Sequence, residues 1–155
     1  MFRLLVLGFF LGAPSEKDAW QLLKSLAGDW QATTSEGKSV PISYQVVSEG
    51  SAVMETMKTA DGAPYMITMY HRDGTGLMLT HYCAAGNQPR MRAAAVAEGG
   101  KKIVFKFLDV TNLANPGADH IRDLTITFTS PKQVVQEWTA RKGGKDSKTV
   151  FTLVR

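Results

Sequence analysis

Cysteine is almost absent from this chain, since Cys83 is the only one among its 155 residues. A single cysteine excludes an intrachain disulfide and a cysteine-rich metal site. The excess of positive charge is also small, because 18 Lys and Arg stand against 14 Asp and Glu and only the segment 141–145 is densely basic. Phosphate binding needs a contiguous basic face, so we expect no nucleic-acid partner.

A membrane-spanning run is missing as well. The apolar segment 4–13 falls short of the about 20 residues that a transmembrane helix needs, but it follows Arg3 and suits the core of a signal peptide. We therefore expect residues 1–13 to be a signal peptide, and the mature protein to be periplasmic or secreted, with no integral membrane segment. The alternative is an apolar N-terminal extension that folds against the rest of the chain.

The remaining residues, 14–155, are predicted to form one domain. With 44% apolar and 21% charged residues, the composition is typical of a globular chain of this size. The domain begins with a short amphipathic helix over 16–27. Ser15 is a suitable N-cap, Trp20, Leu23 and Leu26 share one face at helical spacing, and Gly28 supplies the stop.

Everything after Gly28 has the pattern of short β-strands. β-branched and aromatic residues recur about every twelve positions, separated by turn pairs such as Asp61-Gly62 and Gly143-Gly144. Ten strands are predicted, at 29–34, 39–47, 52–58, 65–72, 77–83, 90–97, 102–111, 120–128, 133–141 and 147–155. The fold class is therefore all-β, most simply a ten-stranded antiparallel up-and-down barrel whose one end is plugged by the helix. A two-sheet sandwich is the alternative.

Pairing each hairpin symmetrically about its turn assigns one face of every strand to the interior. This face carries apolar residues and a polar row on five successive strands, formed by Tyr44, Glu55, Thr68, His81 and Arg92. The longer loops 59–64, 84–89 and 112–119 share one end of the barrel, so we expect them to surround an open mouth. His120 and Arg122 are predicted to lie inside the barrel near that mouth.

Two interpretations of this polar row stay open, because inward-facing charges are costly unless they are paired or hydrated. One is an internal network in which Glu55 pairs with Arg92 and Asp109 pairs with Arg122. The other is a cavity site for a small amphipathic or acidic ligand, with Arg92 and Arg122 binding a carboxylate. The candidate ligand-binding residues are then Tyr44, Glu55, Thr68, His81, Arg92, His120 and Arg122.

Catalysis is a further alternative, in which Glu55 and His81 act as general acid and base of an isomerase or hydrolase. His81 and Cys83 are about 7 Å apart along their strand, too far at the backbone for a direct nucleophile–base hydrogen bond. His81, Cys83 and His120 lack the spacing of a zinc motif. We therefore expect a binding protein without catalytic residues or metal, present as a monomer or homodimer.

The segment Gly28-Asp29-Trp30, which follows the helix and opens the first strand, resembles the calycin group of ligand-binding barrels. This group includes lipocalins, fatty-acid-binding proteins and nitrobindin-like haem barrels. A late Arg packed on the Trp is a calycin feature, and Arg155 would take that role. The chain also resembles uncharacterised bacterial proteins of this class. The resemblance implies a carrier without a required cofactor, or a haem barrel that uses His81 or His120.

Overall fold

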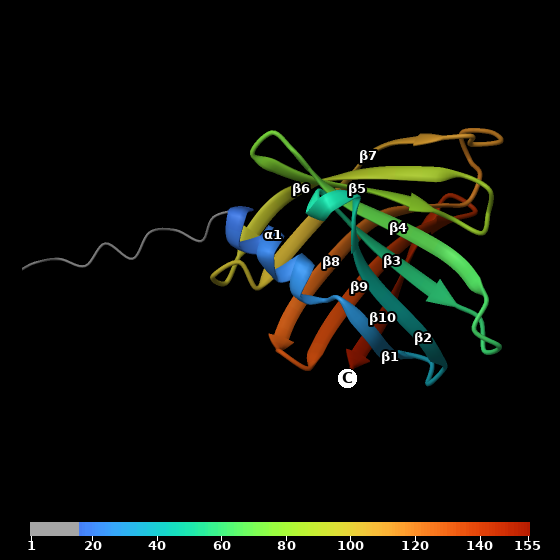
Figure 1. Cartoon of the computed structure of the whole chain (residues 1–155). Helices are drawn as coiled ribbons and strands as arrows, with labels where there is room; N and C mark the ends of the chain where they lie inside the picture. The colour runs from blue at the N-terminus through green and yellow to red at the C-terminus, as the bar shows by residue number, and fades with distance from the viewer. Residues whose placement is uncertain (1–15) are drawn as a thin grey trace, which may run out of the picture.

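The predicted barrel is confirmed by a computed structural model, which describes residues 16–155 (Figure 1). Ten antiparallel strands close in the order β1-β10-β9-β8-β7-β6-β5-β4-β3-β2, so the sandwich alternative is wrong. The strands are β1 (Gly28–Thr34), β2 (Ser39–Val47), β3 (Ala52–Lys58), β4 (Pro64–Asp73), β5 (Gly76–Tyr82), β6 (Gln88–Ala97), β7 (Lys102–Thr111), β8 (His120–Ser130), β9 (Gln133–Lys142) and β10 (Lys145–Val154). The expected signal peptide, residues 1–13, lies outside the described residues.

The predicted helix is present as α1 (Glu16–Ser25), which lies across one end of the barrel (Figure 1). Its apolar face, Ala19, Trp20 and Leu23, is buried in the same core as the interior of the barrel, together with Leu26 of the turn that follows. The chain leaves α1 through a turn in which Leu26 and Ala27 donate to the carbonyls three residues earlier. None of the helical segments within 16–155 combines the length and the apolar character of a membrane span.

Trp30 and Arg155 fix α1 to the barrel. The Trp30 indole is buried and donates from Nε1 to the Leu26 carbonyl at 2.7 Å, and the Arg155 guanidinium lies 4.3 Å from the centre of its ring. Arg155 also donates to the carbonyls of Ser25, Ala27 and Pro131. One side chain therefore joins the end of α1, the start of β1 and the β8–β9 turn, as the sequence predicts for a closed end.

The largest error of the sequence analysis is the register between β5 and β6. Leu79 pairs with Met91, whereas a hairpin centred on the loop 84–89 would place Ala94 opposite Leu79. The real loop is shorter, because the Cys83 N–H donates to the Asn87 carbonyl and the following residues already belong to β6. The slip is three residues, and an odd slip exchanges the two faces of a strand.

A β-bulge limits this exchange of faces to the N-terminal half of β6. Ala93 pairs with Phe105 and Ala95 with Val104, so Ala94 is an extra residue without a partner. The C-terminal half of β6 keeps its predicted orientation, while in the N-terminal half Met91 is fully buried and Ala94 is exposed. Arg90 and Arg92 therefore lie on the outer face, where they pair with Asp109 and Asp73. The prediction that Arg92 points into the barrel is wrong.

Replacing Arg155 by Ala should lower the free energy of unfolding by about 1–2 kcal/mol, because a cation–π contact and charged hydrogen bonds are lost together. Arg155→Lys should lie between wild type and Arg155→Ala, since an ammonium cannot hold three carbonyls while stacking on a ring. Urea unfolding measures all three proteins. Lys145→Ala, a charge loss at the far end of β10, is the control, and an equal effect of both alanine variants would contradict this role of Arg155.

Candidate functional site

Four members of the predicted polar row lie side by side inside the barrel. Tyr44 pairs with Glu55, Glu55 with Thr68, and Thr68 with His81 across β2 to β5. All four side chains are buried. The register of this half of the barrel therefore agrees with the sequence analysis, and the row ends at His81 because β6 presents its other face.

A hydrogen-bond network fills the centre of the barrel around Glu55. Its Oε2 accepts from the Tyr70 hydroxyl at 2.7 Å and from Gln136 Nε2 at 2.8 Å. Gln136 Nε2 also donates to the Tyr44 hydroxyl at 2.7 Å, and Gln136 Oε1 accepts from Trp138 Nε1 at 3.1 Å. Gln136 and Trp138 come from β9, across the barrel from β2, β3 and β4. These side chains therefore occupy the space that the sequence analysis assigned to a cavity.

No cation balances Glu55 within residues 19–155, since its partners are hydroxyl and amide groups. Burial raises the pKa of Glu55, and the hydrogen bonds from Tyr70 and Gln136 oppose this shift. Burial and the nearby carboxyl also raise the pKa of Tyr44 and Tyr70 well above the ordinary value, which keeps both hydroxyls protonated. The expected pairing of Glu55 with Arg92 is therefore replaced by a network of neutral hydrogen-bonding groups.

His81 differs from this network because one of its polar atoms has no partner. Nδ1 lies 2.9 Å from the Thr68 hydroxyl, and the ring packs against Trp138 with a centroid distance of 5.0 Å. Nε2 is buried and makes no hydrogen bond with the described residues. Burial lowers the pKa of His81 to about 4, so the imidazole is neutral at physiological pH. Its Nε2 can donate or accept, depending on which nitrogen the Thr68 bond protonates.

His81 lies at the wall of a pocket of about 230 Å³ in the mouth of the barrel. The pocket is bounded on one side by β3 to β5 and on the other by β8 to β10, and its apolar lining is Met57, Met66, Ile121, Trp138, Ala140 and Phe151. Cys83 and Lys142 also line it. A second hollow of about 300 Å³ adjoins it, shares Cys83 and Lys142, and is lined further by Asp119, His120 and Arg141. Lys142 forms no ion pair with residues 19–155.

The two remaining predicted site residues lie at this end of the barrel. His120 is buried, bonds through Nδ1 to the Ala118 carbonyl and packs against Phe107. Arg122 is the extra residue of a bulge in β8, and its guanidinium stacks 4.7 Å from the Phe107 ring. The expected Asp109–Arg122 pair is wrong, because Asp109 bonds to Arg90 on the outer face.

The catalytic alternative is not assembled in this geometry. Thr68 stands between Glu55 and His81, so the two are separated by two strand spacings, about 10 Å at the backbone. Each has other partners, and no hydrogen bond joins them. Within residues 16–155, no three His, Cys, Asp or Glu side chains gather in a metal-binding group.

Sequence analysis missed four residues that shape the site: Tyr70, Gln136, Trp138 and Lys142. The alternation of side chains along β4 and β9 gives the first three an inward orientation, and a polar atom on an inward-facing residue is a signal that could have added them to the row. Lys142 carries no such signal, because its place at the mouth depends on the length of the β9–β10 turn. The second unpartnered polar atom, Asn87 Oδ1, lies in the β5–β6 loop, and its amide nitrogen bonds to the Asp119 carbonyl.

Comparison with known proteins adds little to this geometry. No family model matches the chain. No curated protein matches it either. Seven chains of solved structures match, among them a redesigned β-barrel that is 14% identical, with a TM-score of 0.37 over 86% of this chain and 93% of that chain.

Replacing Glu55 by Gln tests the state of the buried carboxyl. Because its pKa is raised in the folded chain, the carboxyl keeps its proton above pH 4.5, where the unfolded chain loses it. Wild-type stability should therefore fall as the pH rises through this window, and Glu55→Gln, which has no proton to lose, should lack that decline. Urea unfolding between pH 4.5 and 8 measures the difference. Parallel profiles would contradict a raised pKa.

His81 should have the opposite pH effect. Its pKa falls from 6.5 to about 4 on folding, so between these values the unfolded chain binds a proton that the folded chain does not. The contribution is fully present above pH 6.5 and lost progressively down to about pH 4, by about 3 kcal/mol. His81→Phe lacks this loss, so the stability of the variant relative to wild type should rise from pH 7.5 to pH 4.5. A constant difference between the two would show that the ring charges freely in the fold.

Proposed function

We propose that this protein binds a small amphipathic molecule in the mouth of its barrel and acts as a carrier or sensor of that molecule. The observation that carries the proposal is His81 Nε2, a buried polar atom without a partner in the wall of an apolar pocket. Leaving such an atom unpaired costs about 1–3 kcal/mol. A ligand with a hydroxyl or carbonyl group at its inner end would remove this cost.

The pocket also supports a choice of ligand size and polarity. Its volume of about 230 Å³ is below the about 300 Å³ at which drug-sized ligands begin, which favours a single ring or a short chain. Met57, Ile121 and Phe151 offer contacts to an apolar body, and Lys142 offers its ammonium to an anionic outer end. The acidic ligand expected from the sequence thus keeps its place in the proposal, with Lys142 in the role first given to Arg92 and Arg122.

The calycin resemblance is part of the proposal, since Trp30 and Arg155 pack together at the closed end as that resemblance requires. Haem is a less well-matched occupant. His81 Nε2 offers an axial ligand, but the pocket is small for a drug-sized molecule and haem is larger. Absorption of the purified protein near 400 nm, about where haem has its Soret band, tests this alternative. We also propose a periplasmic or secreted location, which N-terminal sequencing of the protein from its producing cells tests.

His81→Phe separates ligand binding from stability. The Phe ring keeps the contact with Trp138 and removes the unpaired nitrogen, but it also removes the bond to the Thr68 hydroxyl, so the variant should stay folded and lie within about 2 kcal/mol of wild type at pH 7.5. Binding should weaken by about tenfold or more for a ligand that bonds to Nε2. Arg92→Met, on the outer face, is the matched control and should bind normally. Equal affinities of His81→Phe and wild type would contradict the proposal.

Cys83 provides the readout for this experiment, because it lines both hollows of the mouth. Mass spectrometry of protein from its natural source identifies any bound compound, and 4-hydroxyphenylacetate and phenylacetate serve as model ligands with and without an inner hydroxyl. A bound ligand should slow the reaction of Cys83 with a thiol reagent, and the hydroxylated acid should protect better. Absence of any co-purified compound, together with no protection by either acid, would overturn the proposed function.

A further inference from the structure

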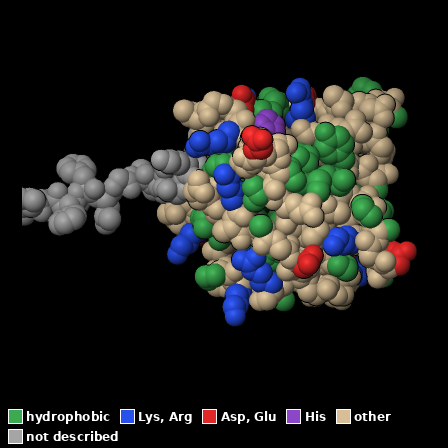
Figure 2. All heavy atoms as spheres, viewed as in Figure 1, with side chains coloured by type: hydrophobic (Ala, Val, Ile, Leu, Met, Phe, Trp, Pro, Cys, Tyr) green, Lys and Arg blue, Asp and Glu red, His purple; other side chains and the backbone are tan. Residues whose placement is uncertain are grey.

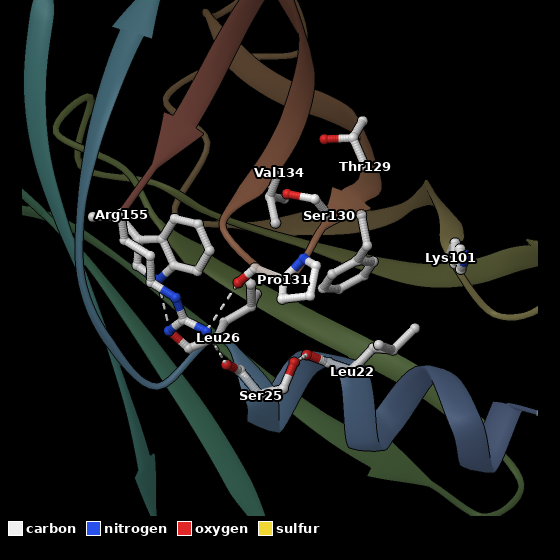
Figure 3. Close-up of a pocket in the computed structure, with 11 residues that line it drawn as sticks. Leu22, Ser25, Leu26, Lys101, Thr129, Ser130, Pro131, Val134 and Arg155 are labelled. Carbon is white, nitrogen blue, oxygen red and sulfur yellow. Dashed lines mark hydrogen bonds between the residues drawn. The ribbon is translucent and has the colours of Figure 1, made fainter.

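An apolar hollow lies at the closed end, opposite the mouth. It is a groove of about 390 Å³ between α1 and the β8–β9 hairpin, with Leu22, Ser25 and Leu26 facing Ser130, Pro131 and Val134 (Figure 3). Its apolar lining is Leu22, Leu26, Trp30, Phe128, Pro131 and Val134. The volume lies within the range of about 300–1,000 Å³ that small-molecule sites occupy.

The groove exists because α1 covers only part of the barrel end. The helix turns Ala19, Trp20 and Leu23 into the core, and Leu22 is left half-buried at the edge of the groove. Arg155 holds the C-terminal end of α1 against Pro131, so the helix cannot move inward to fill the space without breaking those bonds. An apolar hollow therefore remains between two elements that are fixed to each other.

The charged residues that line the groove all have one sign. Its lining contains two cations, Lys101 and Arg155, and no acidic residue. The Arg155 guanidinium already donates to three carbonyls, whereas the Lys101 ammonium forms no hydrogen bond or ion pair with residues 19–155. Lys and Arg side chains also gather around the α1 end of the molecule in the view of Figure 2. The groove thus combines an apolar trough with a cation that is free to bind an anion.

We propose that this groove is a second binding site, separate from the mouth, for a single-chain anionic amphiphile such as a free alkyl carboxylate. The alkyl chain lies between Leu22 of α1 and Phe128 and Pro131 of the hairpin, and the carboxylate lies at Lys101. Contact with the apolar lining supplies most of the affinity, because burial of each methylene stabilises binding by about 0.8 kcal/mol. Lys101 supplies selectivity for an anion over a neutral chain of the same length.

Decanoate, decanol and decyltrimethylammonium, used below their micellar concentrations, test this proposal on the full chain. Methyl NMR shifts of Leu22 and Val134 report occupancy of the groove. Wild type should bind decanoate more tightly than decanol, and the cation most weakly. Lys101→Glu should weaken the binding of decanoate by about two- to fivefold, the scale of an exposed ion pair, and leave the binding of decanol unchanged. Lys145→Glu makes the same charge change at the mouth end and should alter the affinity for neither decanoate nor decanol.

Two further variants locate the bound chain. Thr129→Trp places a large ring in the groove from an exposed position, so it should reduce decanoate binding by about tenfold while the protein stays folded. His81→Phe changes only the mouth and should leave decanoate binding intact. Loss of binding in His81→Phe with retention in Thr129→Trp would move the acid to the mouth and overturn the groove site. The groove site would also be overturned if the methyl shifts of Leu22 and Val134 changed with protein concentration in the absence of ligand. Such a change would show that a second copy of the chain occupies the groove.

Discussion

The hydrogen bonds of Gln136 to Glu55 and Tyr44 are the constraint around which the barrel is organised. They join β9 to β2 and β3 through the interior, at the level where the apolar layers of the two walls meet. Tyr70 and Trp138 bond to the same group, so hydrogen-bonded side chains occupy the centre of the barrel. The hollows described above therefore lie at the two ends of the barrel, two at the mouth and one beside α1.

This arrangement explains why the chemistry of the two ends differs. At the mouth, the inner end of the hollow is lined by neutral groups. Burial keeps the His81 imidazole uncharged, and Arg92 is turned outward. At the closed end, Arg155 brings a cation close to the core only because three carbonyls and the Trp30 ring receive it. Charge is tolerated where the backbone has unpaired carbonyls to offer, and such carbonyls occur at the end of a helix and at a turn.

The sequence analysis succeeds where a local rule is sufficient. Strand periodicity, turn pairs and the helix face give the ten strands and α1, and symmetric pairing about short turns places Tyr44, Glu55, Thr68 and His81 in one row. It fails at β6, because the Cys83–Asn87 turn is shorter than the polar run suggests and the extra residue Ala94 leaves no mark in an alanine-rich segment. Both features reverse the faces of a strand, so a small error in length moves Arg92 from the interior to the surface.

His81 is then informative because of what surrounds it. Gln136, Glu55, Tyr44 and Tyr70 show that this sequence can saturate buried polar atoms when four strands meet at the centre. Nearer the mouth, the same row presents His81 with only Thr68 as a hydrogen-bond partner, beside the apolar side chains of Trp138, Met57 and Ile121. An apolar side chain at this position would remove the lone Nε2 and the Thr68 bond together, and these two changes act on the free energy of unfolding in opposite directions. Core stability therefore leaves this histidine unexplained, and that is the physical basis of the ligand proposed for the mouth.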